Sequence, residues 1–585
     1  MRIAAAACLA ATLVLSAVAV LRRAPEAGNG VRMKTYASFG ETLLHGLRAE
    51  PGDVSYRMPL ATLYSARLQY HAGLPPKALL AAHQAALVIL VFALGCLLHP
   101  YGGLFSAAVA LVLMREGRFD LYPESGYRLL FLMTACLLVW RARAPSLGRT
   151  VLLALAVGTT LLYRTPLAFF PFVLALHEWA VRRRAAPDGL RRQLAVLCVV
   201  PYLFLLPWVA MNRSVHGRFI LFEKDAATAN IVTGALGLVR SVEGDLSTLV
   251  DEPIDLGRSG AVVGWAARQI LRHPLRYASA YGRRAAFAAS RYPVLLVLAV
   301  FSVYHFRRRR EFRQLGLLAA YFLAIHCLMS VEDAYFEPLE PVFAVLAGAL
   351  VFGFRETAPP PADSIGYRLS ALAVNAMLGL VLALSAHAGW VVGAFALLEG
   401  PGDPVRDLDR AVSANPGDSW LLLKRGRERL ARGETAGAVE DLRAAAAAEP
   451  GEAAVGLRLA WARALAGDPA PLLGWSPPPR EGNDDPLQLR LDAEVLKACA
   501  LIREGRGREA EARVRSALEL HEERNILVRG DHGEREREAL EKLRSSETGF
   551  RRQCEDLQGA RPAAEKRALR AILDRLLPAS RPRPS

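Results

Sequence analysis

One arginine of this sequence lies where a charge is costly. Arg164 occupies the short link Tyr163-Arg164-Thr165-Pro166, which joins two apolar stretches of the chain. A charge between two such stretches has little room to escape except into a polar cavity, and charges in that setting are typical of functional sites. A guanidinium pairs best with phosphate or carboxylate oxygens. Arg164 is therefore a candidate functional residue.

The motifs of several other chemistries are missing. There is no CxxC, HExxH or P-loop pattern, and His216, His273 and His326 are isolated, so we expect no metal, redox or NTPase site. Five of the seven cysteines lie within apolar runs, where a thiol behaves as a small hydrophobe. Cys499 and Cys554 lie in a polar region, and their pairing stays open.

Composition indicates which elements position Arg164. The chain has 585 residues, 53% of them hydrophobic and 22% charged, with a net charge of +16. Residues 401–585 contribute 33 basic and 32 acidic residues, net +1, which leaves +15 for residues 1–400. A disordered or nucleic-acid-coating chain is excluded, whereas a membrane protein is not. Only seven of the 72 basic residues are lysine, a bias typical of a GC-rich bacterial genome.

Apolar stretches predict the membrane segments. Roughly 20 apolar residues cross the 30 Å hydrocarbon core as a helix. Eleven candidates lie near residues 3–21, 79–98, 101–114, 127–140, 150–162, 166–181, 194–211, 293–306, 314–330, 338–354 and 369–397. An alternative for the first is a cleaved signal peptide, since Ala17-Val-Ala19 resembles a cleavage site.

The arginine-rich loops predict the orientation, because short cytoplasmic loops collect Lys and Arg. Clusters such as Arg182-Arg-Arg184 and Arg307 to Arg310 fall on one side. The opposite side receives segment 22–78, the link at Arg164 and loop 212–292. We therefore expect a multi-pass protein of the bacterial cytoplasmic membrane whose C-terminal region lies outside the cytoplasm.

A repeat follows the membrane segments. Asn415-Pro-Gly-Asp418 recurs as Glu449-Pro-Gly-Glu452, and Arg432-Gly-Glu434 recurs as Ala466-Gly-Asp468, both 34 residues later. This period is that of the tetratricopeptide repeat, a helix-turn-helix unit that stacks on its neighbours. A generic helical hairpin is the alternative. The repeat implies a protein or peptide partner.

The sequence thus predicts an all-α protein with three parts. Residues 1–397 form a polytopic membrane domain of about eleven transmembrane helices. Residues 398–530 form a soluble tetratricopeptide-like domain, and residues 531–585 form a helical tail.

Several stretches on the outer side resemble the lipid-linked-sugar glycosyltransferases of the C superfamily, the group of the protein O-mannosyltransferases and aminoarabinose transferases. The resemblance covers residues 1 to about 355 and is distributed rather than local. The stretches that carry it are Tyr56-Arg57-Met-Pro-Leu60, Tyr122-Pro-Glu124, Tyr163-Arg-Thr-Pro166, Pro207-Trp208 with Asn212-Arg213-Ser-Val-His216-Gly217-Arg218-Phe219, and Tyr335-Phe-Glu337-Pro-Leu-Glu-Pro341.

The resemblance implies transfer of a sugar from a polyprenyl-phosphate donor to an acceptor at the outer membrane face. That reaction needs a carboxylate to deprotonate the acceptor, cations for the leaving phosphate and an apolar groove for the lipid. Tyr56 belongs to the motif expected to contact substrate. The candidate cations are Arg57, Arg164 and Arg213. For Arg57 and Arg213, snorkelling at the interface is an equal alternative. Some family members use a divalent ion, but nothing in this sequence requires one.

The expected carboxylate is absent from its usual place. Family members carry an acid just before the tyrosine of the first outer loop, whereas this sequence reads Val31-Arg-Met-Lys-Thr-Tyr36. Glu124 and Glu41 are the catalytic candidates instead, with Glu26 and Asp53 as further substitutes in the loop. Glu124 has an alternative role as the helical partner of Arg128.

Two other functions compete with sugar transfer. One is an O-antigen ligase or polymerase, which also combines many membrane helices with an outer repeat domain. The other is a non-catalytic membrane scaffold whose repeats recruit an envelope partner, and the missing acid favours it.

Overall fold

The protein is described from a computed structural model. The described residues are 30–47, 54–68, 76–99, 123–183, 189–223, 227–241, 246, 249–250, 252, 254–353, 365–398, 403–477, 486–527, 550, 554 and 563–576. Within these ranges the structure is helical and has no strand, with one isolated backbone bridge between Arg240 and Val331. The all-α prediction is therefore confirmed.

The chain divides into two compact units. The first comprises Met1–Leu44, Pro51–Ser241 and Gly257–Glu399, and the second comprises His45–Glu50, Val242–Leu256 and Gly400–Ser585. The division at Glu399 lies two residues beyond the predicted boundary. The separate tail predicted from residue 531 stays a prediction.

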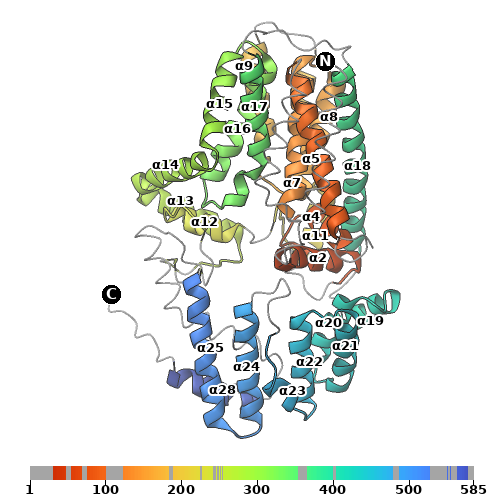
Figure 1. Ribbon diagram of the computed structural model, residues 1–585, viewed down its shortest axis with the longest axis vertical. Coiled ribbons are helices and arrows are strands. Elements are labelled where there is room, and N and C mark those ends of the chain that lie inside the picture. Colours follow the sequence, from red (N-terminus) through yellow and green to blue (C-terminus); the bar gives the residue numbers. More distant parts are fainter. Residues whose placement is uncertain are drawn as a thin grey trace. The chain divides into compact units, whose positions relative to one another are not determined.

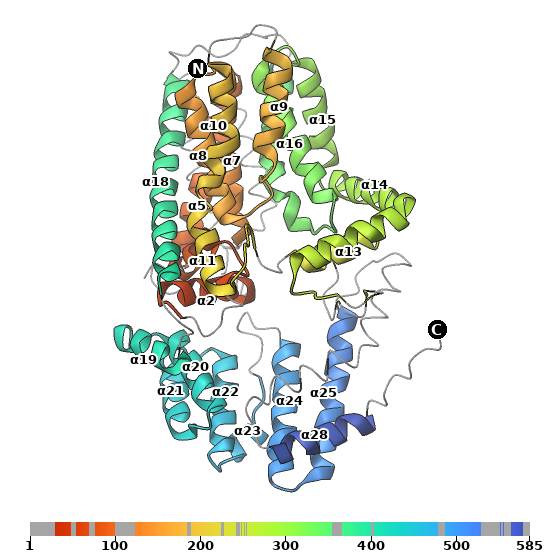
Figure 2. The ribbon, with the colours of Figure 1, turned by 180° about the vertical axis from the view of Figure 1, so that it is seen from behind.

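The first unit is a bundle of long helices with shorter helices at one end (Figure 1). The helices α5, α7, α8 and α18 run side by side in both views (Figures 1 and 2), and α5 packs against both α7 and α18. A second group contains α9, α15, α16 and α17. The helices of this unit are α2 Gly30–Leu44, α4 Pro59–Ala66, α5 Pro76–Leu98, α7 Pro123–Arg143, α8 Leu147–Tyr163, α9 Phe170–Arg182, α10 Leu190–Leu203, α11 Leu206–His216, α12 Thr228–Ala235, α13 Ser259–Arg272, α14 Pro274–Arg291, α15 Pro293–His305, α16 Arg310–Cys327, η4 Asp333–Leu339, α17 Glu340–Gly353 and α18 Ile365–Ala396.

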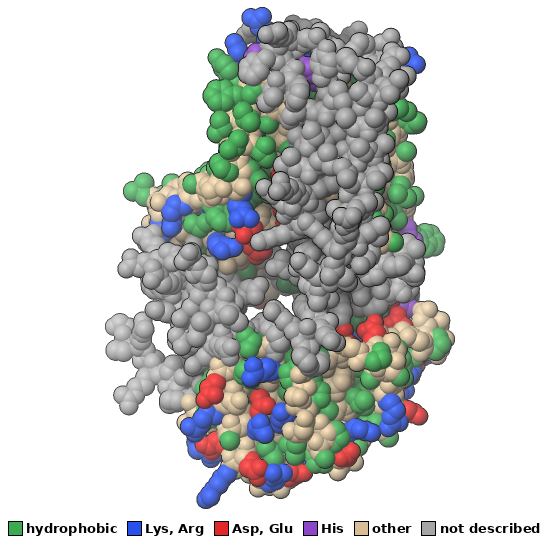
Figure 3. Space-filling view, in the orientation of Figure 1, with side chains coloured by type: hydrophobic (Ala, Val, Ile, Leu, Met, Phe, Trp, Pro, Cys, Tyr) green, Lys and Arg blue, Asp and Glu red, His purple; other side chains and the backbone are tan. Residues whose placement is uncertain are grey.

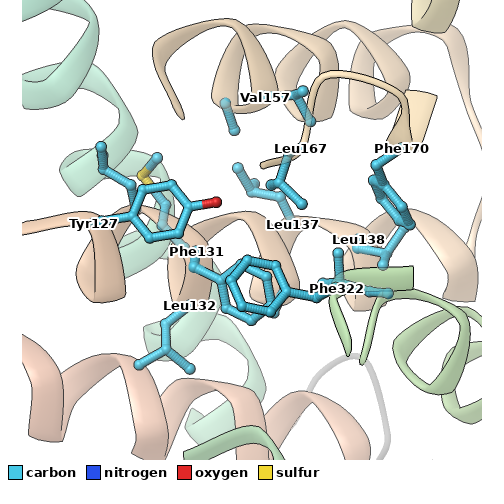
Figure 4. Packing of buried hydrophobic residues seen from close by; sticks show 14 of the residues in the cluster. Tyr127, Phe131, Leu132, Leu137, Leu138, Val157, Leu167, Phe170 and Phe322 are labelled. Carbon is cyan, nitrogen blue, oxygen red and sulfur yellow. The ribbon is translucent and has the colours of Figure 1, made fainter. Parts of the chain in front are cut away.

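Buried aromatic and aliphatic side chains pack together in this unit (Figure 4). The ring centroids of Phe131 on α7 and Phe322 on α16 lie 4.6 Å apart, and Tyr127 stacks on Phe322 at 6.2 Å. All three side chains are buried. Ring pairs with this geometry stabilise the fold beyond the free energy gained by burying the rings. These contacts therefore hold α7 and α16 together.

Far fewer helices than the predicted eleven are long and apolar enough to cross a membrane. Among the described residues three qualify, Ala81–Leu98, Leu190–His216 and Gly366–Ala396. The pair α14 and α15 adds a fourth candidate span if it is counted as one, although it bends by 97°. These spans indicate a membrane protein.

The count of eleven was too high because local apolarity does not fix helix length. The helices α9, α15 and α17 have 13, 13 and 14 residues, whereas crossing 30 Å takes about 20. The helix α16 begins Arg310-Glu-Phe-Arg313, which adds charges to an 18-residue helix. The candidates 3–21 and 101–114 lie outside the described residues.

The second unit is a series of helical hairpins with glycine turns. Gly433, Gly467 and Gly505 all have φ between +76° and +101°, a region that glycine enters without strain. The first two turns are 34 residues apart, as the sequence spacing predicted. The helices are α19 Pro404–Ala414, α20 Ser419–Ala431, α21 Thr435–Ala448, α22 Ala453–Leu465, α23 Ala470–Leu473, α24 Pro486–Arg503, α25 Gly507–Leu527 and α28 Ala563–Leu576.

Side-chain caps and one ion-pair network fix the first hairpins. Asp418 caps α20 by accepting from the backbone N–H groups of Trp420 and Leu421. Arg425 pairs with Asp441 on α21 at 2.6 Å and with Asp409 on α19 at 3.0 Å. Further along, Cys499 and Cys554 are buried and form no disulfide.

Candidate functional site

The turn before α4 meets the end of α11. The Ser55 hydroxyl donates a short hydrogen bond to Oδ1 of Asn212, and Ser55 Oγ lies 2.7 Å from Nε2 of His216. Because Ser55 has a single hydroxyl hydrogen, the Nε2 atom of His216 donates in the second contact. Ser55 is fully buried. The arrangement positions the turn and does not prepare Ser55 as a nucleophile.

A glycine at the end of α11 turns the chain back beside the helix. Gly217 has φ +66° and caps α11 in the left-handed conformation. The returning segment is held by two hydrogen bonds. Asn212 Nδ2 donates to Ile220 O at 3.1 Å, and Trp208 Nε1 donates to Phe222 O at 3.3 Å. This return places Glu223, the next residue, close to the turn that begins at Ser55.

Arg57 lies between aromatic rings and carries a charge partner. Its guanidinium is 4.3 Å from the ring centroid of Tyr56 and 5.3 Å from that of Tyr36. Nε is buried and has no hydrogen-bond acceptor among the described residues. Burial lowers the pKa of Arg57, but the phenol of Tyr36 and the carboxylate of Glu223 outweigh it, so the pKa is raised. The charge of Arg57 is therefore retained.

Arg164 brings a second cation to the same region. Its charge acts on Arg57 and opposes the rise in that pKa, although 107 residues separate the two along the chain. Arg164 is partly buried and follows α8 in an extended conformation, with its backbone N–H donating to Thr160 O at 2.8 Å. It also lies within electrostatic range of Tyr127 on α7 and His326 on α16.

The segment η4 contributes the last of the family-like stretches. Arg128 of α7 forms an ion pair with Glu337 of η4. The ring of Tyr335 lies 5.2 Å from that of His326, which places η4 near the surroundings of Arg164. Arg128, considered above as the partner of Glu124, thus pairs across the bundle with Glu337.

An apolar cavity of about 220 Å³ lies beside these segments. It is bounded by α4, α5, α7, α8 and α18, and its polar wall contains Tyr64, His83 and Tyr163. Tyr64 and His83 are joined by a short hydrogen bond. Tyr163 directly precedes Arg164, and Leu60 of the lining lies three residues after Arg57, so the cavity adjoins both cation-bearing segments. Its shape and lining suit part of an aliphatic chain.

The predicted site residues fall into distinct environments. Tyr56 is 37% exposed, and Arg213 is exposed on α11, next to the buried Asn212. Glu41 is fully buried in α2, where an acceptor molecule has no direct access to it. The side chain of Glu124 lies outside the described residues, as do Glu26 and Asp53.

Sequence reasoning missed Glu223 as a candidate. It directly follows the apolar run Phe219-Ile-Leu-Phe222, itself the continuation of the stretch ending α11, and Asp225 lies two residues later. The change from apolar to acidic residues at this point was the available signal. Its proximity to Arg57 depends on the chain reversal at Gly217, which no local pattern shows.

Comparison with known proteins gave no match to any family model, curated protein or solved structure.

Proposed function

We propose that this protein transfers a sugar from a polyprenyl-phosphate donor to an acceptor on the extracytoplasmic side of a bacterial cytoplasmic membrane. One observation carries the proposal. Arg57 and Arg164, which belong to separate family-like stretches, act on each other electrostatically beside Glu223. Two like charges within electrostatic range of each other suit a ligand with more than one negative charge, and a phosphate ester meets that requirement.

The proposed reaction assigns one task to each group. Arg57 and Arg164 pair with the donor phosphate and stabilise the charge that grows as the bond between the sugar C1 and the phosphate oxygen breaks. Glu223 accepts the proton of the acceptor hydroxyl, whose oxygen forms the new bond to C1 on the opposite face. The products are the inverted glycoside and polyprenyl phosphate. No metal is needed for this balance.

The apolar cavity supplies the third requirement of the reaction. A hydrocarbon chain whose phosphate lies near Arg164 passes Tyr163, which lines the cavity. The cavity would hold the first part of the lipid, and the remainder would lie in the bilayer. In this proposal the bilayer surrounds the protein and also carries the polyprenyl-phosphate donor.

Lipid mass spectrometry with matched variants tests the proposal. A deletion strain is complemented with the parent chain, with Glu223→Gln or with the exposed control Glu519→Gln. We expect the deletion and Glu223→Gln strains to accumulate a polyprenyl-phosphate sugar and lose its glycosylated product, and the other two to show neither change. An unaltered lipid profile in the deletion strain would contradict the function. Full rescue by Glu223→Gln would remove only Glu223 from the mechanism.

A non-catalytic scaffold is the second candidate function. The observation that favours it is the complete burial of Glu41, together with the absence of an acid from residues 31–36. In this case the helical hairpins of the second unit bind a protein or peptide of the cell envelope. Loss of that partner on deleting residues 401–585, with no change in lipid-linked sugars in the full deletion strain, would support the scaffold.

A further inference from the structure

The helices α13 and α14 project sideways from the first unit (Figures 1 and 2). The axis of α14 makes an angle of 97° with that of α15, and the two helices are separated only by Tyr292. The helix α15 exposes Val294, Val297, Val300 and Phe301 by 52–69%. Such exposure is expected of a helix in contact with lipid. Where α15 runs along the membrane normal, a helix perpendicular to it lies along the membrane plane.

The projecting helices carry an exposed apolar stripe. Val263, Ala267 and Leu271 follow one another at intervals of four residues on α13, and all three are exposed. Leu271 is 80% exposed, and Leu275, at the start of α14, is 84% exposed. The opposite side of α13 is buried through Trp265, which is fully inaccessible. Water is therefore a poor environment for the outer face of this hairpin.

Basic charge accompanies the stripe. Residues 258–291 contain seven arginines and no acid. On α13, exposed Arg268 and Arg272 each directly follow a member of the stripe, Ala267 and Leu271. Figure 3 shows hydrophobic and basic side chains next to one another on this projection. An apolar stripe flanked by arginine is the pattern of helices that lie in the headgroup layer of an anionic membrane.

A buried arginine fixes the hairpin in place. Arg284 of α14 is fully buried and donates to Gly234 O at 2.6 Å, Leu238 O at 2.9 Å and Cys327 O at 3.2 Å. Gly234 and Cys327 lie at the ends of α12 and α16, and Leu238 lies in the segment that follows α12. The bonds are charge-assisted and converge from two directions, so α14 keeps its angle to α15 without a bound partner.

We propose that α13 and α14 form an interfacial platform that lies in the headgroup layer, with its apolar stripe in the acyl boundary and lipid phosphates beside Arg268 and Arg272. The tyrosines of α14 support this placement, because Tyr277 and Tyr281 are half-buried, as aromatic residues of an interfacial belt are. A lipid surface is favoured over a protein partner because the platform continues directly into the lipid-exposed side of α15. The inference does not depend on sugar transfer.

Photocrosslinking in the full-length protein tests the platform. A benzoylphenylalanine replaces Leu271, or Leu275 as a second site, in nanodiscs of equal parts phosphatidylglycerol and phosphatidylcholine and in native membranes. The control position is Arg515, exposed on α25. We expect lipid adducts at 271 and 275 and none at 515. Adducts to another protein at 271 and 275, or equal lipid labelling at 515, would overturn the proposal.

The charge preference has a test of its own. Phosphatidylglycerol is expected to exceed phosphatidylcholine among the adducts at position 271. The double variant Arg268→Gln/Arg272→Gln should reduce that excess by about thirtyfold, since each arginine near an anionic surface contributes roughly 1 kcal/mol, or about fivefold. An excess that the double variant leaves unchanged would show that these arginines do not select anionic lipid.

Discussion

Oγ of Ser55 lies 2.7 Å from Nε2 of His216, a residue 161 positions further along the chain. With the bond from Ser55 to Asn212, this contact fastens the Tyr56-Arg57 turn to the end of α11. Two stretches that the sequence linked only through a family resemblance are therefore in direct contact. The position of Arg57 depends on that contact.

Replacing Ser55 tests whether its hydroxyl positions the turn. Ser55→Ala leaves the buried Oδ1 of Asn212 without its donor, and we expect a loss of roughly 1–3 kcal/mol in stability together with partial activity. Ser65 on α4 is the matched control, because its buried hydroxyl has no hydrogen-bond partner among the described residues. Thermal unfolding in detergent measures both. Complete inactivation by Ser55→Ala with unchanged stability would instead indicate a nucleophile.

Arg164→Ala should abolish sugar transfer while leaving the protein folded. A lost charge-assisted donor to a developing anion typically costs on the order of 10²–10³-fold in rate. Arg192→Ala, at an exposed position of α10, is the control. Transfer is measured in membranes at equal protein levels. Full activity in Arg164→Ala would remove Arg164 from the mechanism.

Arg284→Ala should release α14 locally. Hydrogen bonds to a charged group contribute roughly 1.5–3 kcal/mol each, and Arg284 makes several to carbonyls of α12, of the segment after it and of α16. The neighbouring Arg283 is exposed and donates to Gly237 O at 2.9 Å, and it provides the control Arg283→Ala. Hydrogen exchange should rise by orders of magnitude across residues 274–291 in the first variant only. Equal protection in both variants would show that packing alone holds α14.

The cap of α19 predicts a dependence on pH. A hydrogen bond from Arg432 and the backbone N–H groups of Arg406 and Val405 lower the pKa of Asp403. Because its folded pKa lies below the unfolded value of about 4, Asp403 stabilises the hairpin above that pH, and the stabilisation disappears as the pH falls further. Asp403→Asn keeps a cap without the charge. The amides of α19 should be better protected from hydrogen exchange in the parent than in Asp403→Asn at pH 7, and equally protected in both at acidic pH. A difference that stays the same at both pH values would contradict this prediction.

The turns of the second unit could be predicted because they are local. Gly433 and Gly467 follow runs of helical periodicity, and a glycine in the left-handed region needs no distant contact. The membrane segments could be located but not counted, since the same apolar residues serve a helix buried against its neighbours and one facing lipid. Phe322, for example, packs against Phe131 inside the protein and does not face lipid.

The candidate site was predictable only in its parts. Arg164 was predicted from its charge between two apolar stretches, and Arg57 from the resemblance of its motif. Their proximity to each other and to Glu223 depends on the reversal at Gly217 and on the packing of three separate segments, which no spacing in the sequence encodes.

The angle between α14 and α15 also relates the position of η4 to the membrane surface. Arg291, the last residue of α14, pairs with Asp333 at 3.3 Å, and Asp333 begins the same short helix that carries Glu337. If α14 rests in the headgroup layer, the bilayer surface acts as a reference level for η4 and for Arg128, its partner. A lipid-linked phosphate travels at that same level. The protein would then meet its substrate at a constant depth, set by the membrane rather than by the length of any one helix.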